Sequence, residues 1–345
     1  MKLITDKKEY TNKWREHKLS ILQSWEWGEA KRGTWEPIRI TVANIPVSIL
    51  TRKVPLTGKR FGYIPRVLNI YTLKKEHLEE LKEAGNELGL SHLIIDPNTT
   101  KATQNYYQEV GFINSGTTIQ PNQTNVVNLE KTEEELWMEM KGKYRRNYKK
   151  SARQGCKVEV FPSEVDQPLV GENSQEAVER FYKVMETIFA RTSYVMFGLE
   201  YFEKVWKNLS KAGLAKIYIA TKDGKDVGAY FVASDELVVY ELYGGVTNAG
   251  RDVEAGYLLK WEAIKDAKLM GIKYYDHWGV APMKDGEYEK GHELYHISKF
   301  KEGFGGEIIN FASQQIAVYD QLSYRIYNIG KSVNDFLLKL KKRGK

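Results

Sequence analysis

Positive charge is concentrated in one short stretch of this chain, between residues 141 and 157. The eight basic residues of the stretch, with no acidic residue among them, are Lys141, Lys143, Arg145, Arg146, Lys149, Lys150, Arg153 and Lys157. A field of this sign and density suits a polyanion such as tRNA, a nucleotide sugar or a membrane surface. A solvated helix face would have the same composition. The pattern alone leaves both interpretations open.

Two other patterns could carry chemistry. His292, Glu293 and His296 match H-E-x-x-H, which on a helix would bind zinc with the glutamate as general base. Five residues with two free positions match easily by chance, so we expect no metal site. The single cysteine, Cys156, has no nearby His or Asp that would complete a nucleophile. We expect it to be a small, partly buried filler.

The bulk properties are those of a globular protein long enough for two domains. Apolar residues make up 42% of the 345 residues, and the net charge of +7 favours an acidic partner without naming one. A lone cysteine allows no intramolecular disulfide, and the polar N-terminus lacks the apolar core of a signal peptide. We therefore expect a cytoplasmic protein. The basic amphipathic stretch KSVNDFLLKLKKRGK (331–345) leaves peripheral contact with the inner face of the membrane open.

The elements that must position these residues alternate between strands and helices, which indicates an α/β (α+β) fold. In the first half, strands are predicted at 38–42, 47–53, 61–64, 91–95 and around 117–120. Helices are predicted within 14–33 and at 73–88 and 103–109. The strand at 61–64 is predicted to end at Pro65, which has no N–H to donate to a sheet.

The second half repeats this rhythm. Strands are predicted at 125–129, 157–161, 214–221, 225–234, 237–244 and 273–278. Helices are predicted from 132 and at 141–154, 174–191, 199–212 and 256–270. Thr132 followed by Glu135 is a capping-box pattern. We predict two related domains, 1–142 with 313–345 and 143–312, joined by the basic helix at 141–154.

Several short motifs follow one another along nearly the whole chain. They are QSWEWGEAK (23–31), IDP (95–97), QP (120–121), RRN (145–147), YGG (243–245), YLLKW (257–261), Gly271 with Asp276 and Gly279, and FKEGFGGE (300–307). Each is weak alone, but their ordered combination is specific. The chain resembles the FemABX family of peptidoglycan-bridge aminoacyltransferases.

The resemblance implies two acetyltransferase-like (GNAT-type) domains in tandem, the first closed by the last helix, 323–341. It implies a monomer that needs no cofactor and uses aminoacyl-tRNA as co-substrate. The enzyme would transfer Gly, Ala or Ser to the stem-peptide lysine of UDP-MurNAc-pentapeptide or lipid II. No heptad run long enough for a coiled-coil arm is present, so the chain is similar to the compact members.

The resemblance also assigns roles to residues. Phe300 and Lys301 would lie beside the reacting ester, with Lys301 neutralising the developing oxyanion or the peptide carboxylate. Asp96 matches a carboxylate proposed as the base, and a turn hydrogen bond is the alternative. The substrate-binding residues would be Lys31 and Arg191, on the acceptor's diphosphate, together with Tyr194 and Tyr243. Lys143, Arg145, Arg146, Lys149 and Lys150 would contact the tRNA backbone.

The chain departs from the family pattern at one position. Family members often show Arg-Asp-Gly where this chain has Arg191, Thr192 and Ser193. The alternatives are a GNAT-fold enzyme that uses acyl-CoA on another amine, and a tRNA-binding protein without catalysis. The glycine-rich loop that binds CoA phosphates is not recognisable in the sequence, which weighs against the first.

Overall fold

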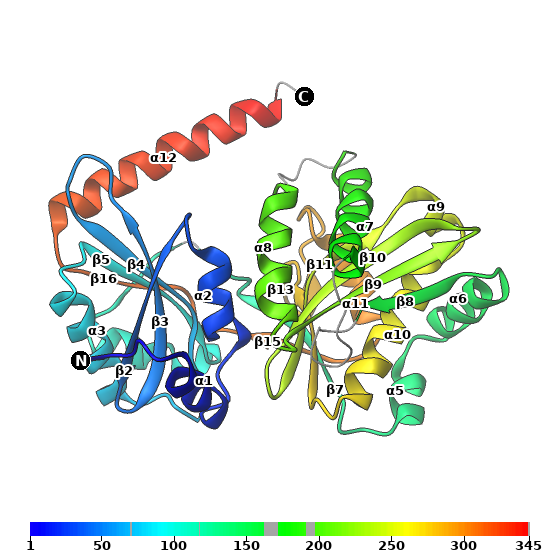
Figure 1. Cartoon of the computed structure of the whole chain (residues 1–345), viewed down its shortest axis with the longest axis horizontal. Helices are drawn as coiled ribbons and strands as arrows, with labels where there is room; N and C mark the ends of the chain where they lie inside the picture. Colours follow the sequence, from blue (N-terminus) through cyan, green and yellow to red (C-terminus); the bar gives the residue numbers. More distant parts are fainter. Residues whose placement is uncertain (70, 117, 162–171, 191–196, 344–345) are drawn as a thin grey trace. The chain divides into compact units, whose positions relative to one another are not determined.

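The computed structural model describes residues 1–69, 71–116, 118–161, 172–190 and 197–343, which form two compact units (Figure 1). Unit 1 comprises Met1–Asn122 and Phe311–Lys345, and unit 2 comprises Gln123–Asn310. The sequence placed the division at 142/143 and 312/313. Residues 123–142 belong with unit 2 because their strand pairs in its sheet, and Leu136 and Met140 lie in its core.

Unit 1 is built on a seven-stranded sheet in the order β1-β2-β3-β4-β5-β16-β6. Its strands are β1 (Lys2–Leu3), β2 (Glu36–Val42), β3 (Ile45–Lys53), β4 (Arg60–Asn69), β5 (His92–Asn98), β6 (Ile113–Asn114) and β16 (Gln315–Val318). Its helices are α1 (Lys7–Glu16), α2 (Trp25–Lys31), α3 (Lys75–Glu87), α4 (Gln104–Glu109) and α12 (Gln321–Arg343), with 3₁₀ turns at Ile21–Gln23 and Lys101–Thr103. β4 and β5 run parallel, and α3 provides the crossover that a parallel pair requires.

Unit 2 has its own seven-stranded sheet, in the order β15-β7-β12-β11-β10-β9-β8. The strands are β7 (Gln123–Asn128), β8 (Lys157–Phe161), β9 (Ala215–Lys222), β10 (Lys225–Ser234), β11 (Val238–Val246), β12 (Tyr274–Gly279) and β15 (Glu307–Asn310), with a separate hairpin of β13 (Met283–Lys284) and β14 (Glu287–Tyr288). The helices are α5 (Glu133–Glu139), α6 (Gly142–Arg153), α7 (Glu172–Phe189), α8 (Leu199–Ser210), α9 (Asn248–Asp252), α10 (Ala255–Leu269) and α11 (Tyr295–Glu302).

The alternation of side chains along β10 explains why helices cover both faces of this sheet. Tyr230 and Val232 join the core that contains α10, whereas the ring of Phe231 meets Phe181 of α7 and Trp206 of α8, with ring centroids 5.8 and 5.9 Å apart. Successive residues of a strand point to opposite faces, so a strand buried on both sides must be apolar throughout. β10 is buried in this way from Val227 onward.

The two sheets share one connection pattern. In each, an antiparallel meander leads to a parallel strand through a helix, and a strand distant in sequence then adds to the parallel one. In unit 1 that added strand is β16, which follows unit 2 in the chain; in unit 2 it is β7, which precedes the rest of the unit. The chain therefore leaves unit 1 before completing its sheet and returns to finish it.

Most predicted elements are present, and three differ. β4 continues past Pro65 to Asn69, because its pairing with β5 resumes at Val67 after a register shift, with positive φ at Arg66 and Leu68. A proline is tolerated beside such an irregularity. The predicted strand around 117–120 is not formed at residues 118–120, and residue 117 lies outside the described residues. The edge strand of the sheet is β6 instead. The basic helix α6 lies inside unit 2, packed against α10, and is not a linker.

The last helix, α12, contributes to unit 1 mainly through its beginning. Tyr324 and Tyr327 approach the ring of His92, with centroid distances of 4.9 and 4.5 Å, and His92 stacks on Phe61. From Asn328 to Asn334 every residue of α12 is exposed. None of the described helices is long and apolar enough to cross a bilayer.

The capping box at the start of α5 gives a stability prediction. The Thr132 hydroxyl accepts from the Glu135 backbone N–H, and the Glu135 carboxylate accepts from the Thr132 N–H at 2.7 Å. Thr132→Ala should lower the free energy of unfolding by about 1 kcal/mol, measured by urea denaturation, because it leaves a helix N–H uncapped. The control is Thr187→Ala, an exposed position in the last turn of α7 whose hydroxyl donates to the Lys183 carbonyl of its own helix, so no loss is expected. Equal stability of the two variants would contradict the cap's contribution.

Candidate active site

The parallel strands β11 and β12 of unit 2 are paired only over their first residues. Val238, Val239 and Tyr240 face Tyr274, Tyr275 and Asp276, and among the described residues the two strands do not pair beyond that point. β11 then shifts register against β10 at Glu241, a bulge of the kind common beside active sites. Open α/β sheets bind ligands at the carboxyl ends of strands that part in this way.

A buried ion pair lies where the strands part. Lys260 of α10 contacts the Glu241 carboxylate, which also accepts from the Tyr275 hydroxyl at 2.7 Å. Lys260 is 1% exposed and its ammonium lies 4.7 Å from the centre of the Tyr230 ring. Burial lowers the pKa of Lys260, and the Glu241 charge opposes that shift. A buried cation is tolerated only with such a partner.

His277 of β12 lies beside this ion pair, and its contact with Lys260 determines which ring nitrogen carries the proton. Lys260 Nζ lies 3.2 Å from His277 Nδ1, and burial together with the charges of Lys260 and Lys301 holds the pKa of His277 well below its ordinary value. The ring is therefore neutral and Nδ1 accepts from the lysine, which leaves the proton on Nε2. Nε2 is buried and has no hydrogen-bond partner among the described residues.

Lys301 of α11 belongs to the same buried cluster. Its ammonium donates to the carbonyl oxygen of Gly279, the last residue of β12, at 2.7 Å. The pKa of Lys301 is lowered to about 8: burial is the main cause, the charge of Lys260 adds to it, and Glu241 and Asp276 oppose it. Lys260 and Lys301 thus both lie near His277 at the end of β12. The pKa of Lys301 is the one that lies close to neutral pH.

Aromatic rings surround the neighbouring Phe300. Its ring centroid lies 5.3 Å from Tyr257 of α10, 5.8 Å from Tyr144 of α6 and 5.2 Å from Phe304. Gly303 is needed here because a Cβ at that position would lie 1.9 Å from the Tyr144 ring. The FKEG sequence therefore ends α11 against α6 and holds Lys301 between an aromatic wall and the strand end.

Tyr243 lies two residues after Glu241 on β11. Its hydroxyl shares a 2.7 Å hydrogen bond with Tyr201 of α8, and its ring meets Phe202. Burial and Tyr201 raise the pKa of Tyr243 well above its ordinary value, so it stays a neutral donor and acceptor. The two other predicted groove residues, Arg191 and Tyr194, lie outside the described residues.

Asp96 lies in unit 1, where it accepts hydrogen bonds from three directions. The donors are the Tyr63 hydroxyl at 2.6 Å, the Gln314 side chain at 2.9 Å and the Gln120 backbone at 3.2 Å. Burial raises the pKa of Asp96, and these bonds and Arg66 oppose the rise. Gln120 and Gln314 belong to the segments by which the chain leaves and re-enters unit 1. The contacts favour a structural role for Asp96 over that of a base.

Arg66 reinforces the same two segments within unit 1. Its guanidinium donates to the carbonyl oxygens of Pro97 at 3.2 Å and Pro121 at 2.6 Å, and lies 3.7 Å from the centre of the Phe311 ring. Asp96 and Arg66 thus hold both passages of the chain at the end of β5.

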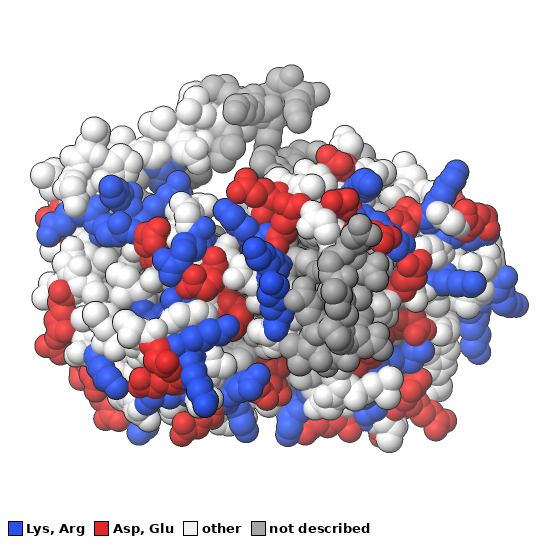
Figure 2. All heavy atoms as spheres, viewed as in Figure 1, with Lys and Arg blue, Asp and Glu red and all other residues white. Residues whose placement is uncertain are grey.

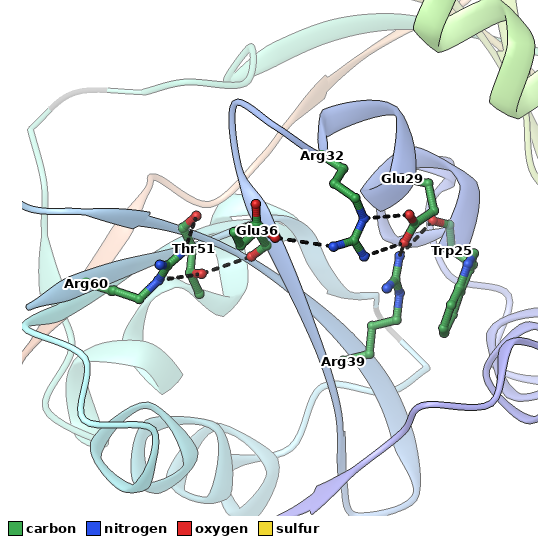
Figure 3. A network of polar contacts seen from close by, with 7 residues as sticks. All are labelled: Trp25, Glu29, Arg32, Glu36, Arg39, Thr51 and Arg60. Atoms are coloured by element: carbon green, nitrogen blue, oxygen red, sulfur yellow. Dashed lines mark hydrogen bonds and ion pairs between the residues drawn. The ribbon is translucent and has the colours of Figure 1, made fainter.

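Lys31 is the last residue of α2, beside a network of charged side chains (Figure 3). Glu29 pairs with Arg32 through both carboxylate oxygens, at 2.7 and 3.0 Å, and with Arg39 at 2.8 Å. Arg39 in turn lies 3.6 Å from the centre of the Trp25 ring. Burial lowers the pKa of Lys31 to about 7, and its ammonium is 4.1 Å from the Trp27 ring. An anionic ligand would restore the full charge of Lys31.

The basic residues of α6 divide into two groups. The Arg145 guanidinium donates to the carbonyl oxygens of Trp137, Met138 and Met140, and so caps the end of α5. Lys150 approaches Glu254 at 3.4 Å, and Lys149 lies 5.8 Å from the Trp137 ring. Figure 2 shows the Lys and Arg side chains gathered where α6 lies in the view, with acidic side chains beside them.

Lys143 and Arg146 are exposed and pair with no residue that the structure describes. These two are therefore the positions of α6 best able to meet an external anion.

The remaining motifs take structural positions. α11 begins only at Tyr295, so His292 precedes the helix, and the shared face that H-E-x-x-H requires is not formed. Cys156 is buried in the unit 2 core. Asp276 accepts from the backbone N–H of Trp278 at 2.7 Å, as a turn-forming aspartate does.

Sequence reasoning missed Glu241, Lys260 and His277. A signal for Lys260 existed, because it interrupts the apolar run from Tyr257 to Trp261. Its neighbours Leu258, Leu259 and Trp261 are all buried. A lysine set among buried apolar neighbours is removed from solvent and must find a buried partner.

Comparisons with known proteins agree with this geometry. Residues 141–289, within unit 2, match the Acetyltransferase (GNAT) domain family. A 108-residue stretch is 32% identical to aminoacyltransferase FemA of Staphylococcus aureus, strains MW2 and COL among them; it covers 31% of this chain and 24% of the relative. The crystal structure of FemX superimposes with a TM-score of 0.80 at 18% identity, over 94% of this chain and 99% of FemX.

The chain is similar to members of the FemABX family. Its fold is also that of a tandem GNAT protein from the clavulanic acid biosynthesis pathway, with a TM-score of 0.51 and 10% identity over 92% of this chain and 97% of that one. The predicted fold class, two GNAT-like domains in tandem, is thereby confirmed. The chain spans about a quarter of the length of the FemA proteins that it matches.

The buried pair of Glu241 and Lys260 gives a thermodynamic prediction. Glu241→Leu or Lys260→Met alone should lower the free energy of unfolding by about 3–5 kcal/mol, because each leaves an uncompensated buried charge. The double variant removes both charges and should recover most of that loss. Urea unfolding of all four proteins forms a double-mutant cycle. Additive losses would show that the two residues are not coupled.

Proposed function

We propose that the chain is an aminoacyltransferase that moves an amino acid from aminoacyl-tRNA to an amine of a peptidoglycan precursor. The observation that carries the proposal is the position of Lys301, buried at the parted ends of β11 and β12 in a GNAT-type unit, with a pKa lowered to about 8. The match to FemA and the likeness of the fold to FemX support this choice of reaction. The acceptor would be the stem-peptide lysine of UDP-MurNAc-pentapeptide or lipid II.

The reaction places few covalent demands on the protein because an aminoacyl ester is already activated. The acceptor amine loses its proton, attacks the ester carbonyl and forms a tetrahedral oxyanion. Collapse breaks the ester bond, forms the amide and returns a proton to the ribose hydroxyl that leaves. The enzyme must therefore align two substrates and stabilise negative charge on one oxygen.

Lys301 suits the second requirement. The Gly279 carbonyl holds one of its three N–H groups, so the ammonium is oriented while its other hydrogens remain available for an acceptor. In a buried setting such a donor acts more strongly than in water. The nearby Phe300 and Tyr257 rings would limit access of water to the ester.

The remaining predicted residues serve binding in this proposal. Lys31, with its pKa lowered to about 7, would regain full charge on a diphosphate of the acceptor. Tyr243 would offer its hydroxyl beside the acceptor, and Lys143 and Arg146 would contact the tRNA backbone. The hydrogen bonds of Arg145 to the end of α5 assign it to α6 packing instead.

A transfer assay tests the reaction directly. The protein is incubated with tRNAs charged with glycine, alanine or serine and with either UDP-MurNAc-pentapeptide or lipid II, and mass spectrometry follows the acceptor. An acceptor heavier by one amino-acid residue is expected. Transfer from acyl-CoA and from no charged tRNA would favour the alternative GNAT enzyme, and tRNA binding without transfer by an intact protein would favour the binding module.

The charge on Lys301 gives a pH prediction. Deprotonation of the acceptor amine should raise the single-turnover rate with pH, and loss of the Lys301 proton should level that rise above about pH 8. Lys301→Ala should slow transfer by about 10²–10³-fold. Lys301→Arg keeps its charge, so any residual activity should continue to rise. An unchanged rate in Lys301→Ala would remove Lys301 from the site; ester hydrolysis without enzyme is the background control.

The exposed part of α6 gives a binding prediction. Lys143→Gln with Arg146→Gln should weaken tRNA binding and flatten its dependence on salt by roughly one to two counterions, because each lost phosphate contact removes about one. The matched control is Lys101→Gln with Lys211→Gln, which removes two exposed lysines elsewhere. Fluorescence anisotropy over a salt series measures both slopes. Equal slopes in the two double variants would exclude α6 from the tRNA contact.

A further inference from the structure

The outer part of α12 carries large apolar side chains that face solvent. Leu322 is 70% exposed, Ile329 66%, Val333 53%, Phe336 61% and Leu337 52%. The helix leaves the sheet of unit 1 after its first turns and runs outward from it (Figure 1). Scattered apolar residues are ordinary on a protein surface, but a continuous series on one helix is not.

These residues share one side of the helix. Steps of four and three residues connect Leu322, Ile326, Ile329, Val333 and Phe336, so at 3.6 residues per turn they lie within an arc of roughly 100°. Ile326 is partly buried at the point where the helix touches the unit 1 core. The stripe therefore begins at the sheet and continues along the exposed turns.

The charge of the segment is strongly one-sided. From residue 321 to the end of the sequence, Asp335 is the single acidic residue. The basic residues of the same segment are Arg325, Lys331, Lys339, Lys341, Lys342, Arg343 and Lys345. A helix with an apolar stripe and an excess of Lys and Arg has the composition of an interfacial membrane helix. Anionic lipid surfaces attract such segments.

We propose that α12 docks this protein on an anionic phospholipid bilayer, with the stripe from Leu322 to Leu337 in the interface plane. The four-three spacing would also suit a coiled-coil seam with a second copy. Charge decides between the two, because pairing two copies would bring together two segments that each carry seven basic residues and one acidic residue. An anionic surface accepts both the apolar stripe and the charge. The docking holds whichever reaction unit 2 catalyses.

Vesicle co-sedimentation of the full chain tests the proposal. Native protein should bind vesicles of equal parts phosphatidylglycerol and phosphatidylcholine, bind phosphatidylcholine vesicles much more weakly, and lose affinity as salt is added. Ile329→Gln with Phe336→Gln removes two exposed stripe residues and keeps helix-favouring side chains. This double variant should bind the anionic vesicles about tenfold more weakly, because less apolar surface enters the interface.

The matched control is Met138→Gln with Leu269→Gln, two apolar helix residues of unit 2 that are 61% and 84% exposed. Its vesicle binding should equal that of the native chain, and circular dichroism should show all three proteins equally folded. Equal vesicle binding by the stripe variant and the control overturns the proposal. So does a native dimer in light scattering that the stripe variant alone fails to form, because the stripe would then be the interface between copies.

Discussion

The buried contact between Glu241 and Lys260 is the constraint on which the candidate site depends. It lies where β11 and β12 cease to pair, and it links a strand, the crossover helix α10 and, through His277, the neighbouring strand. Lys260 cannot reach water and has the Glu241 carboxylate as its buried partner, while burial and the two lysines hold the pKa of His277 well below its ordinary value. These three side chains form the electrostatic surroundings of Lys301. A change in any one would alter the proton affinity of the lysine that faces the proposed reaction.

Unit 1 shows what the same architecture does with a different set of buried charges. Its parallel pair, β4 and β5, remains paired through two register shifts as far as Asn69 and Asn98, so these strands do not part as β11 and β12 do. The charged residues at that end, Arg66 and Asp96, form hydrogen bonds with backbone and amide groups of the two segments by which the chain leaves and re-enters unit 1. In unit 1 the buried charges hold two chain segments at the strand ends. In unit 2 the buried charges surround Lys301.

The sequence predicted the elements well because their signals are local. The capping box at Thr132 and the apolar alternation of the meanders depend on residues close together in the chain. The order of motifs also led to Phe300 and Lys301. The partners of Lys301 were not predictable in this way, because Glu241, Lys260 and His277 come from three elements that only the parallel crossover brings together. The division at 122/123 was missed for a related reason. β7 precedes the strands with which it pairs, and no local sequence pattern indicates which of the two sheets it belongs to.

The position of Asp96 sharpens the question of which group removes the proton from the attacking amine. Its oxygens accept three hydrogen bonds within unit 1, which occupy its lone pairs and hold the carboxylate in place. Lys301 is the opposite case: burial lowers its pKa to about 8, so part of the population is neutral near physiological pH. A neutral amine can accept a proton and an ammonium can stabilise an oxyanion. The proposed transfer uses the ammonium form, so the proton of the attacking amine must go to an acceptor other than Lys301.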